Sequence, residues 1–213
     1  DEVAPMLPPG IVVAAHNAAE LIAVSGREDE LAAAAAALTE AGVRSRRLPG
    51  RCGFHSALMD PACERLRAVG ARLPVAAPKL PMLSNVTGGW HDGAPAPGYW
   101  ADHARPAVLF HANLTAALAE PRAVLVELGP GSSLAGLASQ HADHGGRPTI
   151  VTLPGAASAK GDAISEPELL ATALGRLWAA GVEVAWPRRG RRVRLPGVRF
   201  QRRHFWLAPA ART

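Results

Sequence analysis

The residue with the clearest chemical potential is His55, in the run Cys52-Gly53-Phe54-His55-Ser56 just before a helix start at Asp60 and Pro61. The positive end of a helix dipole disfavours a positive charge on a nearby imidazole. A neutral imidazole is what a general base requires near pH 7. Glycine in this loop would let the backbone approach a neighbouring segment closely. The local pattern therefore favours a general base, although loop histidines more often have structural or surface roles.

Two other groupings of metal-ligand residue types fit known sites less well. Cys52, His55 and Cys63 could form a zinc set, but a fourth ligand is not apparent and the spacings fit no common zinc site. His141 and His144 form an HxxH pair, which surface histidines explain more simply than a metal site. We therefore predict no metal site.

Composition restricts the class of protein. The 213 residues allow one large domain or two small ones, and 48% apolar content is ordinary for a chain with a buried core. Two cysteines make no disulfide framework, which favours a reduced, cytoplasmic setting. No apolar run reaches the ~18 residues that span a bilayer, and Asp1-Glu2 does not open a signal peptide. The turn at 129–131 lacks the third glycine and the acidic partner of a dinucleotide fingerprint.

The net charge of +5 comes from the last segment, because arginines crowd residues 188–203. One interpretation is contact with nucleic acid or phosphate. The simpler one is a solvated basic surface or one that faces an acidic neighbour. No recognisable nucleic-acid module accompanies the arginines, so we predict no nucleic-acid partner and keep an arginine-tail binder as an alternative.

The first part of the chain predicts a small α+β unit. The expected elements are strands at 11–15 and 21–25, a helix at 27–41, a strand at 43–48 and a helix from Pro61 to about Gly70 that is capped by Asp60. Two strands, a helix, a strand and a helix in that order indicate a ferredoxin-like unit over about residues 10–75.

The middle of the chain predicts an α/β layer, and the last part a linker. The expected elements are a strand at 80–86, a helix at 99–118 interrupted by Pro106, an apolar buried strand at 123–128, a helix capped by Ser132, and a strand at 149–153. Residues 154–166 form a small-residue loop, Pro167 begins a helix with an apolar stripe, and 182–186 form a short strand. Strand–helix alternation favours a doubly wound α/β arrangement.

Six motifs, in order, resemble the acyltransferase domains of modular type I polyketide synthases. They are Val13-Ala14-Ala15-His16-Asn17 with Ala23-Val24-Ser25-Gly26, Phe54-His55-Ser56 with Leu58-Met59 and Pro61, Ser84-Asn85-Val86-Thr87-Gly88, Tyr99-Trp100 with Arg105 and Phe110, Val126-Glu127-Leu128-Gly129-Pro130-Gly131, and Phe200-Gln201-Arg202-Arg203 with Phe205-Trp206. Any one of them would be weak, but the ordered set covers nearly the whole chain. The chain resembles the C-terminal portion of a malonyl-CoA:acyl carrier protein transacylase-like domain with its post-acyltransferase linker.

The resemblance implies an α/β fold in three parts. These are a ferredoxin-like α+β small subdomain within 1–75, the C-terminal part of an α/β-hydrolase-like large subdomain at 76–153, and the linker at 154–213. It also implies a missing N-terminal part of the acyltransferase and an adjacent ketosynthase domain as neighbours.

The resemblance further implies ping-pong transfer of a malonyl-type group from coenzyme A to the phosphopantetheine thiol of an acyl carrier protein. His55 would be the base for a serine in a GHSxG elbow, which this sequence lacks, and a backbone carbonyl at His103 would orient His55. Phe54 and Asn85 would lie at the substrate, with Phe54 filling the space that an α-methyl group needs. No cofactor is implied, because the coenzyme A thioester is itself a substrate. We do not assign Ser56 as the nucleophile, because adjacency to His55 in the sequence is not evidence for that role.

The absent serine elbow leaves a second interpretation open. The chain could be a non-catalytic docking or scaffold fragment of a synthase, which keeps contacts with a neighbouring domain and has no activity of its own. In either case we expect exposed apolar surface where the other half of an acyltransferase would pack.

Overall fold

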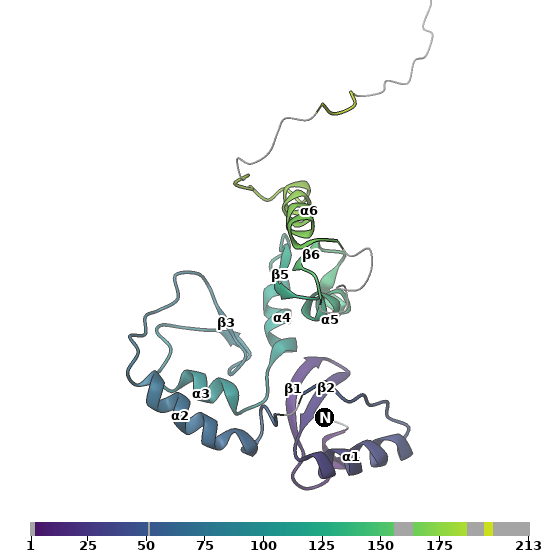
Figure 1. Ribbon diagram of the computed structural model, residues 1–213, viewed down its shortest axis with the longest axis vertical. Helices are drawn as coiled ribbons and strands as arrows, with labels where there is room; N and C mark the ends of the chain where they lie inside the picture. The colour runs from purple at the N-terminus through teal and green to yellow at the C-terminus, as the bar shows by residue number, and fades with distance from the viewer. Residues whose placement is uncertain (1–2, 51, 156–163, 187–193, 198–213) are drawn as a thin grey trace, which may run out of the picture.

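The computed structural model describes residues 3–50, 52–155, 164–186 and 194–197 as a mixed α/β structure (Figure 1). Its strands are β1 (Val12–Ala18), β2 (Leu21–Ser25), β3 (Leu83–Ser84), β4 (Gly89–Trp90), β5 (Leu125–Pro130) and β6 (Thr149–Leu153). Its α-helices are α1 (Glu28–Glu40), α2 (Asp60–Gly70), α3 (Tyr99–Ala104), α4 (Phe110–Leu118), α5 (Ser133–Ser139) and α6 (Glu166–Ala179). Short 3-10 turns are η1 (Ala4–Met6), η2 (Ala57–Met59) and η3 (Ala142–His144). No helix in these described ranges is long and apolar enough to cross a membrane.

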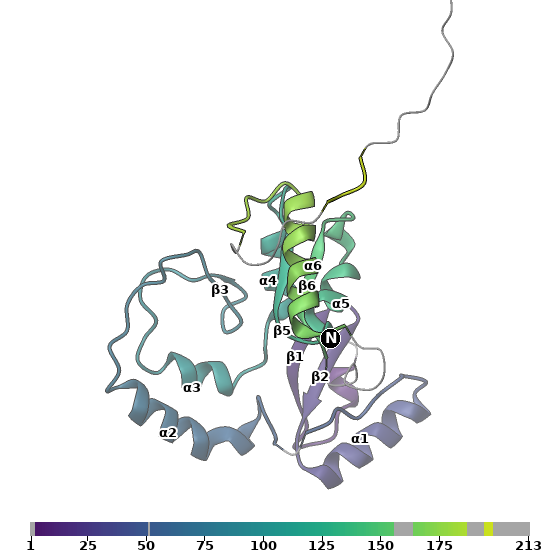
Figure 2. The ribbon, with the colours of Figure 1, turned by 45° about the horizontal axis from the view of Figure 1, so that its top comes forward.

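The predicted hairpin at the start of the chain is confirmed. β1 and β2 pair antiparallel, and α1 lies beside them in both ribbon views (Figures 1 and 2). Glu28, Asp29 and Glu30 occupy the first turn of α1, where carboxylates oppose the helix dipole. β1 also exchanges backbone hydrogen bonds with Val108, which draws the chain after α3 against the hairpin.

The strand predicted at 43–48 is wrong, because this segment has no regular secondary structure. Three arginines in it are exposed, and one of them, Arg47, pairs with Glu28 of α1 at 2.8 Å. A strand needs a partner ladder and a face to bury, and the charged side chains supply no apolar face. The hairpin therefore remains two-stranded in the described structure, and a complete ferredoxin-like sheet is not confirmed.

Helix α2 packs against α3, which lies beside it in both views (Figures 1 and 2). A Cβ atom added at Gly70 would collide with the carbonyl oxygen of Pro97, so only glycine permits this approach. The prediction that Asp60 caps α2 is wrong: Met59 holds the cap position and Asp60 is the first residue of the helix. The preceding turn η2 is capped instead by Ser56, whose hydroxyl accepts from the Leu58 amide.

The strand predicted at 80–86 is much shorter than expected. Only β3 forms, and it pairs with β4 across a tight turn. Pro78 and Pro81 lie just upstream and have no amide hydrogen to donate to a ladder, which limits the strand. Ser84 is fully buried, and its hydroxyl lies 2.9 Å from that of Tyr99, which ties the hairpin to α3. The helix predicted at 99–118 forms as α3 and α4 with the break at Pro106, as expected.

The parallel pair β5–β6 is confirmed, but β5 is only half buried. α4, α5 and α6 gather around this pair in Figure 2, and its core contains Leu114, Leu118 and Ala138 with Leu125 packed against them. Along β5 the side chains alternate between half-buried and exposed, and Leu128 is 85% exposed. The expectation of a buried strand fails because β5 has one paired neighbour and one covered face in the described structure.

Helix α5 is capped by a strand residue. The Glu127 carboxylate accepts from the amides of Leu134 at 3.2 Å and Ala135 at 2.8 Å. The side chain of Ser132, the cap that the sequence favours, makes no capping hydrogen bond. A carboxylate at a helix N-terminus both satisfies free amides and opposes the dipole, so Glu127 joins β5 to α5.

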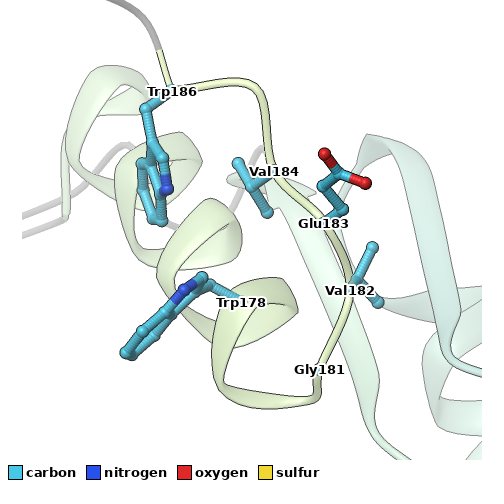
Figure 3. Close-up of a pocket in the computed structure, with 6 residues that line it drawn as sticks. All are labelled: Trp178, Gly181, Val182, Glu183, Val184 and Trp186. Atoms are coloured by element: carbon cyan, nitrogen blue, oxygen red, sulfur yellow. The ribbon is translucent and has the colours of Figure 1, made fainter.

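Helix α6 forms as predicted, with a capping box between Ser165 and Glu168, and it packs on β6. The strand predicted at 182–186 is wrong, because those residues have no regular secondary structure. They turn back at the end of α6 and frame an open pocket (Figure 3). Its lining is Trp178, Gly181, Val182, Glu183, Val184 and Trp186. The arginine- and aromatic-rich stretch at 198–207 lies outside the described residues.

Candidate active site

His55 has a left-handed backbone, with φ of 59°, and it is the one non-glycine residue of the described ranges with positive φ. Positive φ is uncommon for residues other than glycine, although histidine is enriched there together with Asn and Asp, and such a residue in a loop is a reason to look for function. The neighbouring Ser56 is buried and donates to the Gly53 carbonyl at 2.6 Å while accepting from the Leu58 amide. The Ser56 hydroxyl thus closes a tight loop around the histidine.

Two contacts join His55 to the end of α3 and the chain just after it. Its amide donates to the Ala104 carbonyl at 3.2 Å, and its ring Nδ1 lies 2.9 Å from the Pro106 carbonyl oxygen. A carbonyl oxygen only accepts, so Nδ1 carries the hydrogen of this bond. In the neutral ring Nε2 is then the acceptor, which is the arrangement that a general base for a hydroxyl or thiol needs.

The carbonyl that orients His55 belongs to Pro106 rather than to His103, which corrects the expectation from the sequence. α3 ends at Ala104, and carbonyls at and beyond a helix end have no partner within the helix. The imidazole of His103 packs against the rings of Tyr99 and Trp100 instead, with centroids 6.1 and 6.3 Å away.

Comparison with known proteins gives this histidine its context. Residues 1–166 match the family described as "Acyl transferase domain". The chain belongs to this family.

Its curated relatives are polyketide synthases. The chain is 35% identical over 215 residues to a phenolphthiocerol/phthiocerol polyketide synthase of Mycobacterium tuberculosis, covering 98% of this chain and 14% of that protein. It is also 35% identical to polyketide synthase GfsA of Streptomyces halstedii, covering 94% of this chain and 3% of that protein.

Solved acyltransferase structures share its fold. The acyl transferase domain of SpnD, in complex with 2-(pent-4-yn-1-yl)malonyl, superposes with a TM-score of 0.78 at 38% identity, over 85% of this chain and 44% of that one. The malonyl-CoA:acyl carrier protein transacylase of Xanthomonas oryzae superposes with a TM-score of 0.61 at 26% identity, over 68% of this chain and 46% of that one. The acyltransferase chain thus spans less than half of these solved structures and a small part of the curated synthases.

Of the other residues that the sequence assigns to the site of this acyltransferase chain, Phe54 lies beside His55 as its neighbour in the chain, and no hydrogen bond of the described structure joins Asn85 to His55. Phe54 precedes His55 and is 55% exposed, so its side chain is accessible to a ligand. Asn85 lies on the turn after β3, where its carbonyl accepts from the Leu109 amide at 3.0 Å and its side-chain oxygen accepts from Asn113 at 2.8 Å. Asn85 thereby ties the β3–β4 turn to α4, and its contact with substrate stays a prediction.

Cys52, His55 and Cys63, the residues considered as a zinc set, lie in different environments. The Cys63 thiol is buried and donates to the Ala101 carbonyl at 3.5 Å, whereas Cys52 is exposed. Both cysteines are free, and the described residues contain no cluster that could hold a metal ion. Ser56 is buried with its hydrogen given to Gly53, so it is not placed to act as a nucleophile.

His141 is not the surface residue that the sequence suggested. It is buried, its Nε2 lies 3.0 Å from the Thr115 hydroxyl, and its Nδ1 accepts from the Asp143 amide. Burial lowers the pKa of His141, and the nearby His111 lowers it further. A neutral ring suits a position whose Nδ1 accepts, so His141 fastens η3 to α4. His144 is half-buried, with its Nε2 2.8 Å from the Thr149 hydroxyl.

Sequence reasoning missed two contributors to the site. One is the carbonyl of Pro106, a residue that the sequence marks only as a helix break. The other is an ion pair between Asp60 and Arg105, whose Oδ1 and Nε lie 2.6 Å apart beside the His55 loop. An acidic residue at a helix start and an arginine at a helix end were both visible in the sequence, but nothing in their 45-residue separation paired them.

Proposed function

We propose that this chain is the C-terminal part of a polyketide synthase acyltransferase, which loads a malonyl-type extender unit from coenzyme A onto an acyl carrier protein. The observation that carries the proposal is the anchoring of His55 Nδ1 by the Pro106 carbonyl, which leaves Nε2 to take a proton. Membership of the acyl transferase domain family supplies the reaction class.

In the proposed mechanism the nucleophile is a serine outside these residues. Nε2 of His55 takes the serine proton as the oxygen attacks the thioester carbonyl, and the C–S bond then breaks. The departing coenzyme A sulfur receives that proton, leaving an acyl-serine ester. In the second half-reaction His55 takes the proton of the phosphopantetheine thiol, whose sulfur attacks the ester, and returns the proton to the serine. Protons balance over the cycle, and no cofactor is required.

The finer division of the fold belongs to the same proposal. We assign the small subdomain to 1–75, the C-terminal part of the large subdomain to 76–153, and the post-acyltransferase linker to 154–213. The open two-stranded β5–β6 sheet supports an incomplete large subdomain, whereas the family match continues past residue 153 to residue 166. The exposed face of β5 would then receive the N-terminal part of the domain, and the linker would contact an adjacent ketosynthase domain. The two free cysteines support a cytoplasmic location.

The proposal is tested by acylation of the synthase that carries this chain. Incubated with radiolabelled malonyl-coenzyme A, it should form a covalent malonyl-enzyme and pass the label to acyl carrier protein. An acyl-enzyme that never forms, with binding to neighbouring synthase domains intact, would support the scaffold fragment instead.

Phe54 should restrict the choice of extender unit. Its ring is exposed and belongs to the residue next to His55, so it would occupy space that an α-methyl group needs. One methyl group in a pocket is worth about 1–3 kcal/mol of discrimination. Phe54→Ser should therefore raise the methylmalonyl-to-malonyl ratio of kcat/KM by about tenfold. Leu73→Ser is the matched control, because Leu73 is similarly exposed but lies beyond the far end of α2. An unchanged ratio in Phe54→Ser would remove Phe54 from substrate selection.

A further inference from the structure

The Asp60–Arg105 ion pair stands at the junction of the two segments that hold His55. Asp60 is the first residue of α2, five positions after His55, and Arg105 directly precedes Pro106. Their Oδ1 and Nε atoms lie 2.6 Å apart, a length typical of a strong charge-assisted hydrogen bond. Both side chains are partly exposed, so the pair can be altered without opening the core.

The pair holds the start of a backbone stretch, residues 105–109, that lies outside the helices on either side of it. α3 ends at Ala104, and the chain runs without regular structure until α4 begins at Phe110. At its far end this stretch is held by the Val108 and Leu109 amides, which donate to the carbonyls of Ala14 and Asn85. At its near end, between the two carbonyls that contact His55, the side chain of Arg105 reaches back to α2.

We propose that Asp60 and Arg105 are a positioning pair, which keeps the Pro106 carbonyl at the distance where it orients His55. The role rests on the proposed acyl-transfer function and adds to it two residues that do not touch substrate. Misplacing a catalytic group by about 1 Å can cost a hundredfold in rate, so a pair that adds little to stability can still matter for turnover.

The same two helices provide a matched control. Arg67 of α2 pairs with Asp102 of α3 at 3.4 Å, with both side chains about half exposed. Arg67 lies seven residues beyond Asp60, about 10 Å further along α2. This pair joins α2 to α3 itself, and no side-chain hydrogen bond of the described structure links it to the His55 loop or to Pro106.

The test measures malonyl transfer to acyl carrier protein by the synthase carrying Asp60→Asn, Arg105→Gln, both changes together, Arg105→Lys, or Arg67→Gln. Each neutralising single change should lower kcat by about tenfold with KM unchanged. The double variant should be no slower than the slower single variant, because both changes break one interaction. Arg105→Lys should recover part of kcat, and Arg67→Gln should match the unaltered synthase. Equal losses from Arg67→Gln and Arg105→Gln, or an unaltered kcat in both neutralising variants, would overturn the proposal.

A second readout does not depend on turnover. Carbethoxylation of His55 by diethyl pyrocarbonate, followed by peptide mass spectrometry, reports the nucleophilicity of Nε2, which the Nδ1–H bond to the Pro106 carbonyl raises. Asp60→Asn and Arg105→Gln should slow this reaction at His55, whereas Arg67→Gln should leave its rate unchanged. If the unaltered synthase transfers no malonyl group, the proposed function fails, and the carbethoxylation rates still decide whether the pair positions His55.

Discussion

Replacing His55 by alanine should lower the rate of malonyl transfer by about 10²–10⁴-fold in the synthase that carries this chain. The Pro106 carbonyl holds Nδ1, so the imidazole presents Nε2, and alanine offers no group that could take the serine proton. KM for malonyl-coenzyme A should change little, because the loss falls on proton transfer. The measurement is the initial rate of label transfer to acyl carrier protein at saturating donor.

His103→Ala is the matched control for that experiment. Its imidazole contacts only the rings of Tyr99 and Trp100 among the aromatic side chains of the described structure, and the orienting carbonyl belongs to Pro106. Its removal should cost about tenfold at most, through repacking of α3. A His55→Ala enzyme that keeps more than about a tenth of its rate would rule His55 out as the base.

Ile150→Ala should destabilise the chain by about 2–5 kcal/mol, the second large effect that we expect. Ile150 of β6 is 2% exposed, so its truncation leaves a cavity that the surrounding side chains fill only in part. Leu128→Ala on the neighbouring strand is the control, because Leu128 is 85% exposed and its loss should change the free energy of unfolding by about 0.5 kcal/mol at most. Urea unfolding followed by circular dichroism measures both.

Leu128→Ala should have a different effect on stability in a complete acyltransferase. If the N-terminal part of the domain covers β5, Leu128→Ala should become destabilising there by about 2 kcal/mol or more. A Leu128→Ala variant that stays neutral in the complete domain would show that this face of β5 is left uncovered.

Sequence signals alone determined the position of several helices and the family of this protein. The apolar stripe and the Ser165–Glu168 capping box define α6, and the ring of Pro106 separates α3 from α4 whatever packs around them. Six ordered motifs indicated the acyltransferase family, which the match over residues 1–166 confirmed. These features depend on neighbouring residues, so the sequence alone carries them.

Tertiary structure decided every feature that needed a distant partner. The strand at 43–48 does not form because no ladder receives it, and β5 is exposed on one face because its sheet has two strands in the described part of the chain. Glu127 rather than Ser132 caps α5, since the path of β5 brings its carboxylate to the free amides.

The site follows the same division. The sequence identified His55, whose loop and following helix are local features. The sequence assigned the orienting carbonyl to His103. Motif spacing gives positions along the chain, but it does not show in which direction the chain runs after a helix ends. Only the packing of α2 on α3 brings Pro106, 51 residues away, to Nδ1 of His55 and sets Arg105 against Asp60. Hydrogen-bond geometry is fixed in three dimensions, and a partner so far along the chain is chosen by the fold.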